Sequence, residues 1–244
     1  MRGHSPVARA GMLVLLTSVA SVCGGGEQSN QVKSDDTQVA RGPDTQPGWT
    51  VLFDGTATSA WRGFKRQDLP SGWQIVDGAL TRVGPGGDII TRDQFGDFEL
   101  ELEWRVEPKG NSGIMYRVTE EDANTYRTGP EMQVLDDAGH ADGKNRLTSA
   151  GSNYGLHAAP EGAVKPAGEW NHARIVARGA HIEHWLNGQK VVEYELWSPD
   201  WEAKVKASKF SAWSGYGRAK RGHVALQDHG DRVAFRNIRI RELK

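Results

Sequence analysis

FELELEWRV, the run Phe98–Val106, decides the fold of this chain. Apolar side chains alternate in it with charged ones without interruption. Because successive side chains of a β-strand point to opposite faces, such a strand has one apolar and one charged face. We therefore predict a long strand whose apolar face lies on a hydrophobic core. The side chains on that face are Phe98, Leu100, Leu102, Trp104 and Val106.

Other segments also have the pattern of short strands. Asn187-Gly188 and Asp77-Gly78 are dipeptides that favour the tight turn of a β-hairpin. Strands are predicted over residues 73–76, 79–83, 114–118, 131–135, 173–177, 182–186, 190–194, 223–227 and 233–240. One helix is predicted over residues 199–207, with Ser198 as its N-cap and Pro199 at its first position. Many short strands and little helix predict an all-β fold, an antiparallel jelly roll or β-sandwich.

The composition narrows the class of partner. The chain has 244 residues, with 30 Lys and Arg against 31 Asp and Glu. This balance gives no reason to expect nucleic acid or an anionic membrane surface as a partner. The chain also has 9 Trp and 30 Gly, a composition that suits a β-protein with many tight turns. The indole rings either stack on sugars or fill the core of the sandwich.

The N-terminal residues have the pattern of an export signal. Arg2 and Arg9 precede an apolar run over residues 12–22 that is too short to span a bilayer. We predict a signal peptide over residues 1–23. Cys23, the only cysteine, lies at its end and is predicted to be lipidated. The chain is then expected to be an exported, periplasmic or outer-envelope lipoprotein that meets the membrane only through its lipid anchor.

The rest of the chain divides into a linker and one domain. Residues 24–47 are rich in Gly, Ser, Gln, Asp and Pro, and we predict a flexible linker there. Residues 48–244 are predicted to form a single domain. With only one cysteine, this domain is expected to be stabilised by packing without a disulfide.

The usual catalytic motifs, such as GxSxG and HExxH, are absent from the sequence. Polar residues on strands are therefore the candidates for chemistry. In the segment 129–136, Glu131 and Gln133 share one face of a strand. They could form a polar floor for a sugar, or the solvated face of an edge strand.

Two more segments carry candidates of the same kind. Arg117 shares a face with Met115 if its strand is regular, and Gln227 and His229 project to one side. Each of these residues can also be an ordinary solvated side chain at a strand end. The sequence alone does not show that they converge.

Short blocks in these segments resemble, in order, the 3-keto-disaccharide hydrolase family. The blocks are Val51–Gly55 leading to Trp61, Asn111–Ile114 with Arg117, Gly129–Gln133, Glu169–Asn171, Leu186–Gly188, Gly222–Gly230 and Phe235–Ile238. The resemblance covers residues 49–243. It departs from the family pattern at Tyr154, where a small residue is expected before an Ile-Tyr pair.

The resemblance implies a concanavalin A-like jelly roll of two curved antiparallel sheets, with the active groove on the concave face. It also implies an enzyme that cleaves glycosidic bonds of 3-keto-glucosides or 3-keto-disaccharides. The route would be hydrolysis, or elimination of the C2 proton followed by hydration. A partner oxidoreductase would make the 3-keto substrate.

Such chemistry needs a base, a group that stabilises the enolate oxygen and groups that orient the sugar. Glu131 or His229 could be the base, and Arg117 the enolate stabiliser. Gln133 and Gln227 could orient hydroxyl groups. The other predicted substrate-binding residues are Asn111, Asp136, Tyr154 and Trp213.

Three alternatives stay open at this point. An ordinary glycosidase would pair Glu131 with a second carboxylate in Asp136, although a regular strand places these two on opposite faces. A Ca²⁺ or Mn²⁺ ion could hold the ketone, with Glu131, Asp136 and His229 as ligands. The third alternative is a non-catalytic, lectin-like carbohydrate-binding module. Trp201, Trp213 and Tyr216 are expected at the rim of the groove, whether the domain is an enzyme or a binding module.

Overall fold

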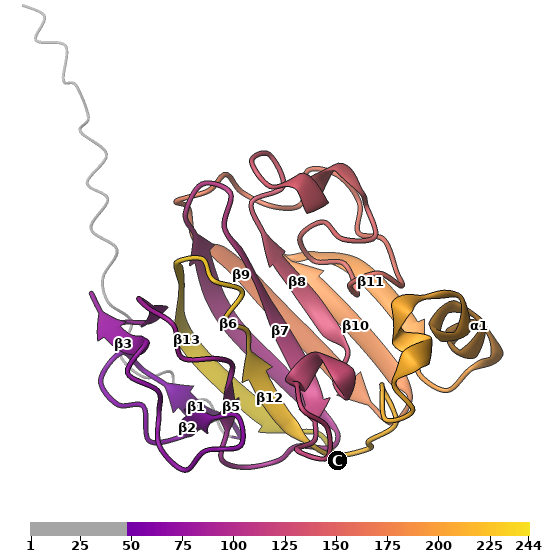
Figure 1. Cartoon of the computed structure of the whole chain (residues 1–244), viewed down its shortest axis with the longest axis horizontal. Helices are drawn as coiled ribbons and strands as arrows, with labels where there is room; N and C mark the ends of the chain where they lie inside the picture. The colour runs from indigo at the N-terminus through magenta and orange to yellow at the C-terminus, as the bar shows by residue number, and fades with distance from the viewer. Residues whose placement is uncertain (1–47) are drawn as a thin grey trace, which may run out of the picture. The chain divides into compact units, whose positions relative to one another are not determined.

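A computed structural model describes residues 48–244 of the chain. The predicted signal peptide (1–23) with Cys23 and the predicted linker (24–47) lie outside the described residues. Residues 48–244 form two antiparallel β-sheets that pack face to face, with the smaller sheet toward the viewer in Figure 1. Within this part of the chain, no helix is long and apolar enough to cross a membrane.

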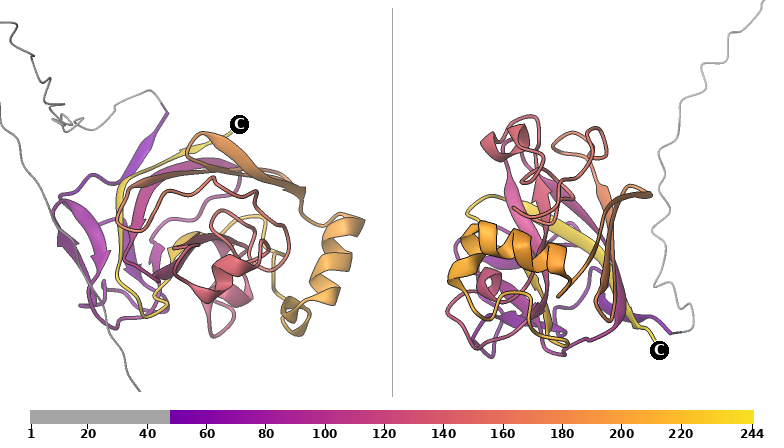
Figure 2. Two further views of the ribbon diagram at one scale, coloured as in Figure 1. Left: turned by 90° about the horizontal axis from the view of Figure 1, so that it is seen from above. Right: turned by 90° about the vertical axis from the view of Figure 1, so that its right-hand side faces the viewer.

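The larger sheet has eight strands in the order β11-β10-β9-β6-β13-β4-β3, with β1 paired to β13. It curves over the smaller sheet, as Figure 2 shows from above. Its strands are β1 (Thr50–Phe53), β3 (Trp73–Val76), β4 (Ala79–Arg82), β6 (Phe98–Val106), β9 (Asn171–Arg178), β10 (His181–Leu186), β11 (Gln189–Glu195) and β13 (Val233–Glu242).

The smaller sheet has five strands in the order β2-β5-β12-β7-β8. They are β2 (Trp61–Gly63), β5 (Ile89–Thr91), β7 (Asn111–Val118), β8 (Glu131–Leu135) and β12 (His223–Leu226). The helical elements are the 3₁₀-helices η1 (Thr125–Arg127), η2 (Ala141–Lys144) and η3 (Lys209–Ala212), and the α-helix α1 (Pro199–Ala207). The predicted all-β sandwich of two antiparallel sheets is confirmed.

Strand β6 has the two faces that its alternating sequence predicts. Its apolar side chains are at most 3% exposed and lie in the core. Its outward glutamates pair with arginines of neighbouring strands, since Glu101 accepts hydrogen bonds from Arg239 and Glu103 from Arg236 on β13. These cross-strand pairs occupy the solvent face and fix the register at the centre of the larger sheet.

Most of the predicted elements are present. All ten predicted strand segments, Phe98–Val106 included, overlap an observed strand. Helix α1 spans the predicted residues, and the Ser198 side chain accepts a hydrogen bond from the amide of Trp201. The three strands without a prediction are the short edge or outer segments β1, β2 and β5.

The core corrects one prediction about aromatic residues. Trp201 and Tyr216 were expected at a groove rim, but they are 0% and 1% exposed. Their rings stack in parallel inside the core, with centroids 5.9 Å apart. The sequence places Trp201 on the predicted helix and Tyr216 in the loops after it, and both rings are buried because Trp201 of α1 stacks between Tyr194 of β11 and Tyr216.

A second, smaller apolar cluster underlies the outer face of the five-stranded sheet. It consists of Ile90, Met115, Val118 and Ala225, with Phe64 and Tyr126 packed against it. Because these side chains point away from the main core, this face of the sheet has its own apolar base. The candidate site lies beside this cluster, on the same face.

Candidate functional site

The centre of the candidate site is the carboxyl group of Glu131 on β8. In the register of the smaller sheet, Glu131 pairs with Met115 and Gln133 pairs with Gly113 on β7. The Glu131 side chain leans across β7, because a Cβ built on Gly113 would lie only 2.1 Å from Glu131 Oε1. The absence of a side chain at Gly113 thus makes the space that this carboxyl group occupies.

The surroundings of Glu131 favour its neutral form. The residue is only 7% exposed, and no described residue donates a hydrogen bond to its carboxyl group. The pKa of Glu131 is raised to about 8: burial is the main cause, the charge of Lys209 opposes it, and the charges of Asp88 and Asp142 add to the rise. A carboxyl group that titrates near neutral pH is suited to general acid–base chemistry.

One wall of the site is formed by the loop that follows β8 and by η3. The amide of Tyr154 donates a hydrogen bond to the carbonyl oxygen of Glu131, 3.0 Å away, and its hydroxyl donates to Asp142 Oδ2 at 3.3 Å. Lys209 Nζ lies 4.4 Å from the centre of the Tyr154 ring. Burial and the charges of Asp142 and Glu131 raise the pKa of Tyr154 to about 12, so its hydroxyl stays protonated at neutral pH.

The opposite wall carries a second carboxylate, Asp88, immediately before β5. Asp88 accepts hydrogen bonds from the amide of Asp228 at 2.8 Å and from the Thr125 hydroxyl. Burial raises the pKa of Asp88, and the charge of His229 lowers it. Asp88 and His229 therefore interact, and Asp88 also interacts with Glu131 across the site.

The loop that carries His229 is held by Asp228. The Asp228 carboxylate accepts hydrogen bonds from the amides of Gly86 and Gly87, at 3.0 and 2.9 Å. It also pairs with Arg82 at 2.7 Å. These bonds fix the segment after β12 against the segment before β5, and His229 itself is exposed to solvent.

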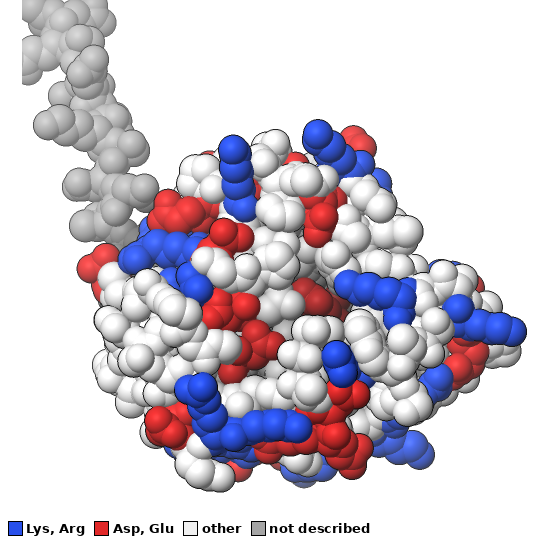
Figure 3. All heavy atoms as spheres, in the orientation of Figure 1, with Lys and Arg blue, Asp and Glu red and all other residues white. Residues whose placement is uncertain are grey.

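Figure 3 shows this face of the molecule. Acidic side chains gather around a hollow at its centre, over β12, β7 and β8, and basic side chains surround them. An acidic hollow with a basic rim is consistent with a site for a neutral polar ligand such as a sugar.

Two amide side chains of the smaller sheet and its loops have a buried oxygen atom with no hydrogen-bond partner among the described residues. They are Asn111 Oδ1 at the start of β7 and Gln227 Oε1 after β12. The amide of Gln227 donates to the carbonyl oxygen of Gly113 at 3.0 Å, which places Gln227 beside Gly113. Buried polar atoms generally have partners, so these two oxygens are candidates for accepting hydrogen bonds from substrate hydroxyl groups.

The structure corrects the prediction for Arg117. Its guanidinium donates to the carbonyl oxygens of Gly96 and Gly179, at 2.9–3.1 Å, and is only 2% exposed. Met115 pairs with Ala225 and Val118 with His223, so β7 has one extra residue in this interval. This bulge, with Arg117 at a φ of 52°, turns the side chain to the core side, away from Glu131.

The side chains of Gln133 and Asp136 are hydrogen-bonded to backbone groups of neighbouring segments. Gln133 Nε2 donates to the carbonyl oxygen of Thr148 at 3.2 Å and its Oε1 accepts from the amide of Val134. Asp136 Oδ2 accepts from the amide of Lys109 at 2.7 Å. Both side chains hold loops in place, so their predicted roles as sugar ligands, and that of Asp136 as a second catalytic carboxylate, are corrected.

The remaining expectations concern Trp213 and a metal ion. Trp213 is partly buried beside Tyr126, with ring centroids 5.4 Å apart, at the edge of the apolar cluster. The metal set of Glu131, Asp136 and His229 does not form. Within residues 48–244, three such ligand atoms come within 4.8 Å of one another only at His181, Glu183 and Glu193, on the larger sheet.

Sequence reasoning missed Asp88, Asp142 and Lys209. Asp88 precedes a strand of only three residues, and the other two lie in or beside short 3₁₀-helices. No local pattern marks these positions, because their importance depends on long-range packing. The residues predicted from sequence that remain candidates for this site are Glu131, Tyr154, Gln227, Asn111 and His229.

Comparison with known proteins supplies the family. The profile of the 3-keto-alpha-glucoside-1,2-lyase-like domain matches residues 48–241. The chain belongs to this family. A 3-keto-disaccharide hydrolase of Bacteroides thetaiotaomicron is 36% identical to it over 247 residues, covering 88% of this chain and 85% of the relative. The family predicted from sequence is thereby confirmed.

Solved structures of Parabacteroides distasonis proteins agree with the family in fold. One, proposed to be a glycosyl hydrolase, has a TM-score of 0.74 and 33% identity, covering 81% of this chain and 94% of that protein. A second has a TM-score of 0.64 and 31% identity, covering 80% and 99%. The match with both extends over the whole β-sandwich.

Proposed function

We propose that this 3-keto-alpha-glucoside-1,2-lyase-like enzyme cleaves the glycosidic bond of 3-keto-glucosides by elimination, with Glu131 as the base that removes the C2 proton. Membership of the family supports a glycoside-cleaving enzyme acting on 3-keto sugars. The observation that carries the mechanism is the buried Glu131 carboxyl group, whose pKa is raised to about 8, mainly by burial, and to which no residue of 48–244 donates a hydrogen bond.

The ketone at C3 makes this route accessible to a carboxylate. It acidifies the C2 proton, and the glycosidic oxygen on C1 lies β to the resulting carbanion. Removal of the C2 proton by Glu131 gives an enolate, and its collapse forms the C1–C2 double bond as the C1–O bond breaks. Addition of water to the enone, with hydroxide at C1 and a proton at C2, then gives 3-keto-glucose, so the net change is hydrolysis.

A cation is needed near the enolate oxygen. Arg117 points to the core, and Lys209 is the cation whose charge acts on Glu131. We assign the enolate-stabilising role to Lys209, with the Tyr154 hydroxyl as a second donor. Asn111 and Gln227 are assigned to the substrate hydroxyl groups because each keeps a buried oxygen atom without a partner among the described residues, and the backbone of Gln227 is bonded to Gly113.

The leaving oxygen needs a proton, and His229 is assigned to supply it. His229 is exposed at the mouth of the site, where its charge acts on Asp88. Asp88 is held by Thr125 and by the amide of Asp228, so its position does not depend on His229. This arrangement places the base at the centre of the site and the acid on one of its walls.

The test is a comparison of substrates and variants. Purified protein is mixed with 3-keto-trehalose, 3-keto-lactose and a 3-keto-β-glucoside, and with each unoxidised parent sugar. We expect release of 3-keto-glucose from one or more keto sugars and from none of the parents. Glu131→Gln should abolish release while the circular dichroism spectrum is unchanged. Binding of the sugars without any release would contradict the proposed activity and would indicate a carbohydrate-binding module.

We also propose that the enzyme is exported, is lipidated on Cys23 and works after an oxidoreductase. The support for export is the sequence of residues 1–23, and the support for the partner is chemical, because a C3 ketone must be made by an oxidation. Cells grown with a labelled fatty acid should label the wild-type chain and not the Cys23→Ala variant. Label in both chains, or in neither, would argue against the anchor.

A further inference from the structure

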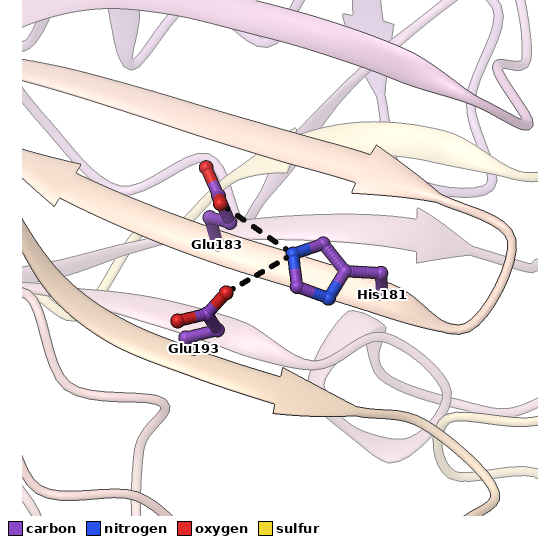
Figure 4. Close-up of side chains that lie close together, drawn as sticks. All are labelled: His181, Glu183 and Glu193. Atoms are coloured by element: carbon purple, nitrogen blue, oxygen red, sulfur yellow. Dashed lines mark hydrogen bonds and ion pairs between the residues drawn. The ribbon is translucent and has the colours of Figure 1, made fainter.

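The outer face of the larger sheet carries a cluster of metal-ligating side chains, far in the fold from Glu131. His181 and Glu183 project from β10, and Glu193 projects from the adjacent strand β11, directly opposite Glu183. Figure 4 shows the three side chains pointing toward one another. His181 Nε2 lies 3.4 Å from Glu183 Oε1 and 3.4 Å from Glu193 Oε1.

We propose that His181, Glu183 and Glu193 form a zinc site, with one nitrogen and two oxygen ligands and a fourth position for water. Zn²⁺ takes tetrahedral ligands at about 2.0–2.2 Å, which places neighbouring ligand atoms about 3.3–3.5 Å apart. The three atoms already lie within 4.8 Å of one another on paired strands, so little movement is needed. An imidazole with two carboxylates is a donor set that suits zinc.

The surroundings of the three ligands support this proposal independently. The other ring nitrogen, His181 Nδ1, lies 2.6 Å from Glu195 Oε1. A carboxylate on the distal nitrogen is the usual support of a metal-bound histidine, because it directs the second nitrogen to the metal. Trp185 Nε1 donates to Glu183 Oε2 at 2.7 Å, which leaves Glu183 Oε1 to face His181. Two of the three ligands are thus oriented by neighbouring groups.

The charges of the cluster also favour a cation. Glu183 and Glu193 lie opposite each other, and like charges in this position destabilise a strand pair. Lys190 Nζ lies 2.7 Å from Glu193 Oε2 and 3.3 Å from Glu183 Oε1, and it compensates part of this repulsion. Zinc would replace the ammonium group, so Lys190 is expected to compete with the metal.

The test uses the full chain without an affinity tag, stripped with EDTA, in calorimetric titrations with ZnSO₄. We expect one zinc per chain, and tetrahedral d–d absorption bands when Co²⁺ replaces it. Glu195→Gln should weaken binding by about 10–100-fold, and His181→Gln or Glu193→Gln should weaken it more. Lys190→Met should tighten binding, an effect that damaged folding cannot produce.

The controls separate this site from other sources of zinc binding. His172→Gln removes another partly buried histidine on the neighbouring strand β9 and should leave the affinity unchanged. Glu131→Gln should also leave it unchanged, because the zinc site is independent of the proposed function. Absence of binding, or binding that His181→Gln and Glu193→Gln do not alter, would overturn the proposal.

Discussion

The carboxyl group of Glu131 occupies the space that a side chain at Gly113 would fill. A Cβ on Gly113 would lie 2.1 Å from Oε1 and 2.7 Å from Cδ of Glu131. The position of the proposed base is therefore set by a glycine on the neighbouring strand. This contact places Glu131 over β7, between the wall with Lys209 and Tyr154 and the wall with Asp88 and His229.

Gly113→Ala is expected to displace the Glu131 carboxyl group and to lower kcat. A displacement of about 1 Å at a reacting group can cost about 100-fold in rate. Steady-state kinetics on a 3-keto-glucoside would measure the loss. Gly84→Ala is the matched control, because a Cβ there has no neighbour closer than 3.9 Å. Equal activity in both variants would mean that the Gly113 contact does not position the base.

The rate is expected to depend on pH through Glu131. Burial raises the pKa of Glu131 to about 8, and the base acts as the carboxylate, the form that grows as the pH rises. The value of kcat/KM should therefore rise up to about tenfold per pH unit below pH 8 and level off above it. Because His229 is proposed to act as the acid, the Glu131 limb is measured in the His229→Gln variant, which lacks that titrating group. A rate in this variant that falls as the pH rises through 8 would assign Glu131 the role of an acid.

Lys209→Met should lower kcat and also move the pH profile. Removal of one group that stabilises an oxyanion can lower kcat about 100-fold or more. Because Lys209 is exposed, its removal should have a smaller effect, a loss of at least about tenfold in kcat. The charge of Lys209 lowers the pKa of Glu131, so the profile should shift to higher pH. Lys209→Arg should restore part of both effects. Lys206→Met, on the exposed side of α1, should change neither.

Arg117→Met should destabilise the fold and leave the chemistry intact. The guanidinium donates to the carbonyl oxygens of Gly96 and Gly179 in a buried setting. Loss of these bonds should cost about 3 kcal/mol or more in the free energy of unfolding. Arg218→Met, which breaks an exposed pair with Glu202, should cost about 1 kcal/mol or less. A large loss of kcat in correctly folded Arg117→Met would indicate that Arg117 acts in the active site.

The sequence predicted those parts of the molecule that depend on local patterns. The alternation in Phe98–Val106 gave the central strand and its buried face, and strand parity put Glu131 on the outer face of the smaller sheet. Arg117 was predicted on the same face as Met115, and this was wrong because a bulge in β7 shifts the alternation of side chains between them. Nothing in the sequence around Arg117 predicts the bulge. The partners of Glu131 depend on contacts between distant segments, which no local pattern records.

Polar residues near the predicted strand ends show the same limit. Gln133 and Asp136 have the side chains that a sugar site requires, but the backbone of adjacent loops occupies them. Asn111 and Gln227 have the same chemistry and keep a buried oxygen free. Only the course of the surrounding loops distinguishes these two pairs, and that course is set by the whole fold.

The most direct test of the mechanism follows the C2 hydrogen by NMR. A 3-keto-glucoside is turned over in D₂O by wild-type enzyme and by Glu131→Gln, beside a sample without enzyme that measures spontaneous exchange. The proposed elimination predicts that the 3-keto-glucose released by the wild-type enzyme carries deuterium at C2, and that Glu131→Gln neither releases it nor speeds exchange. Release with hydrogen retained at C2, or full turnover by Glu131→Gln, would contradict the role of Glu131 as the base.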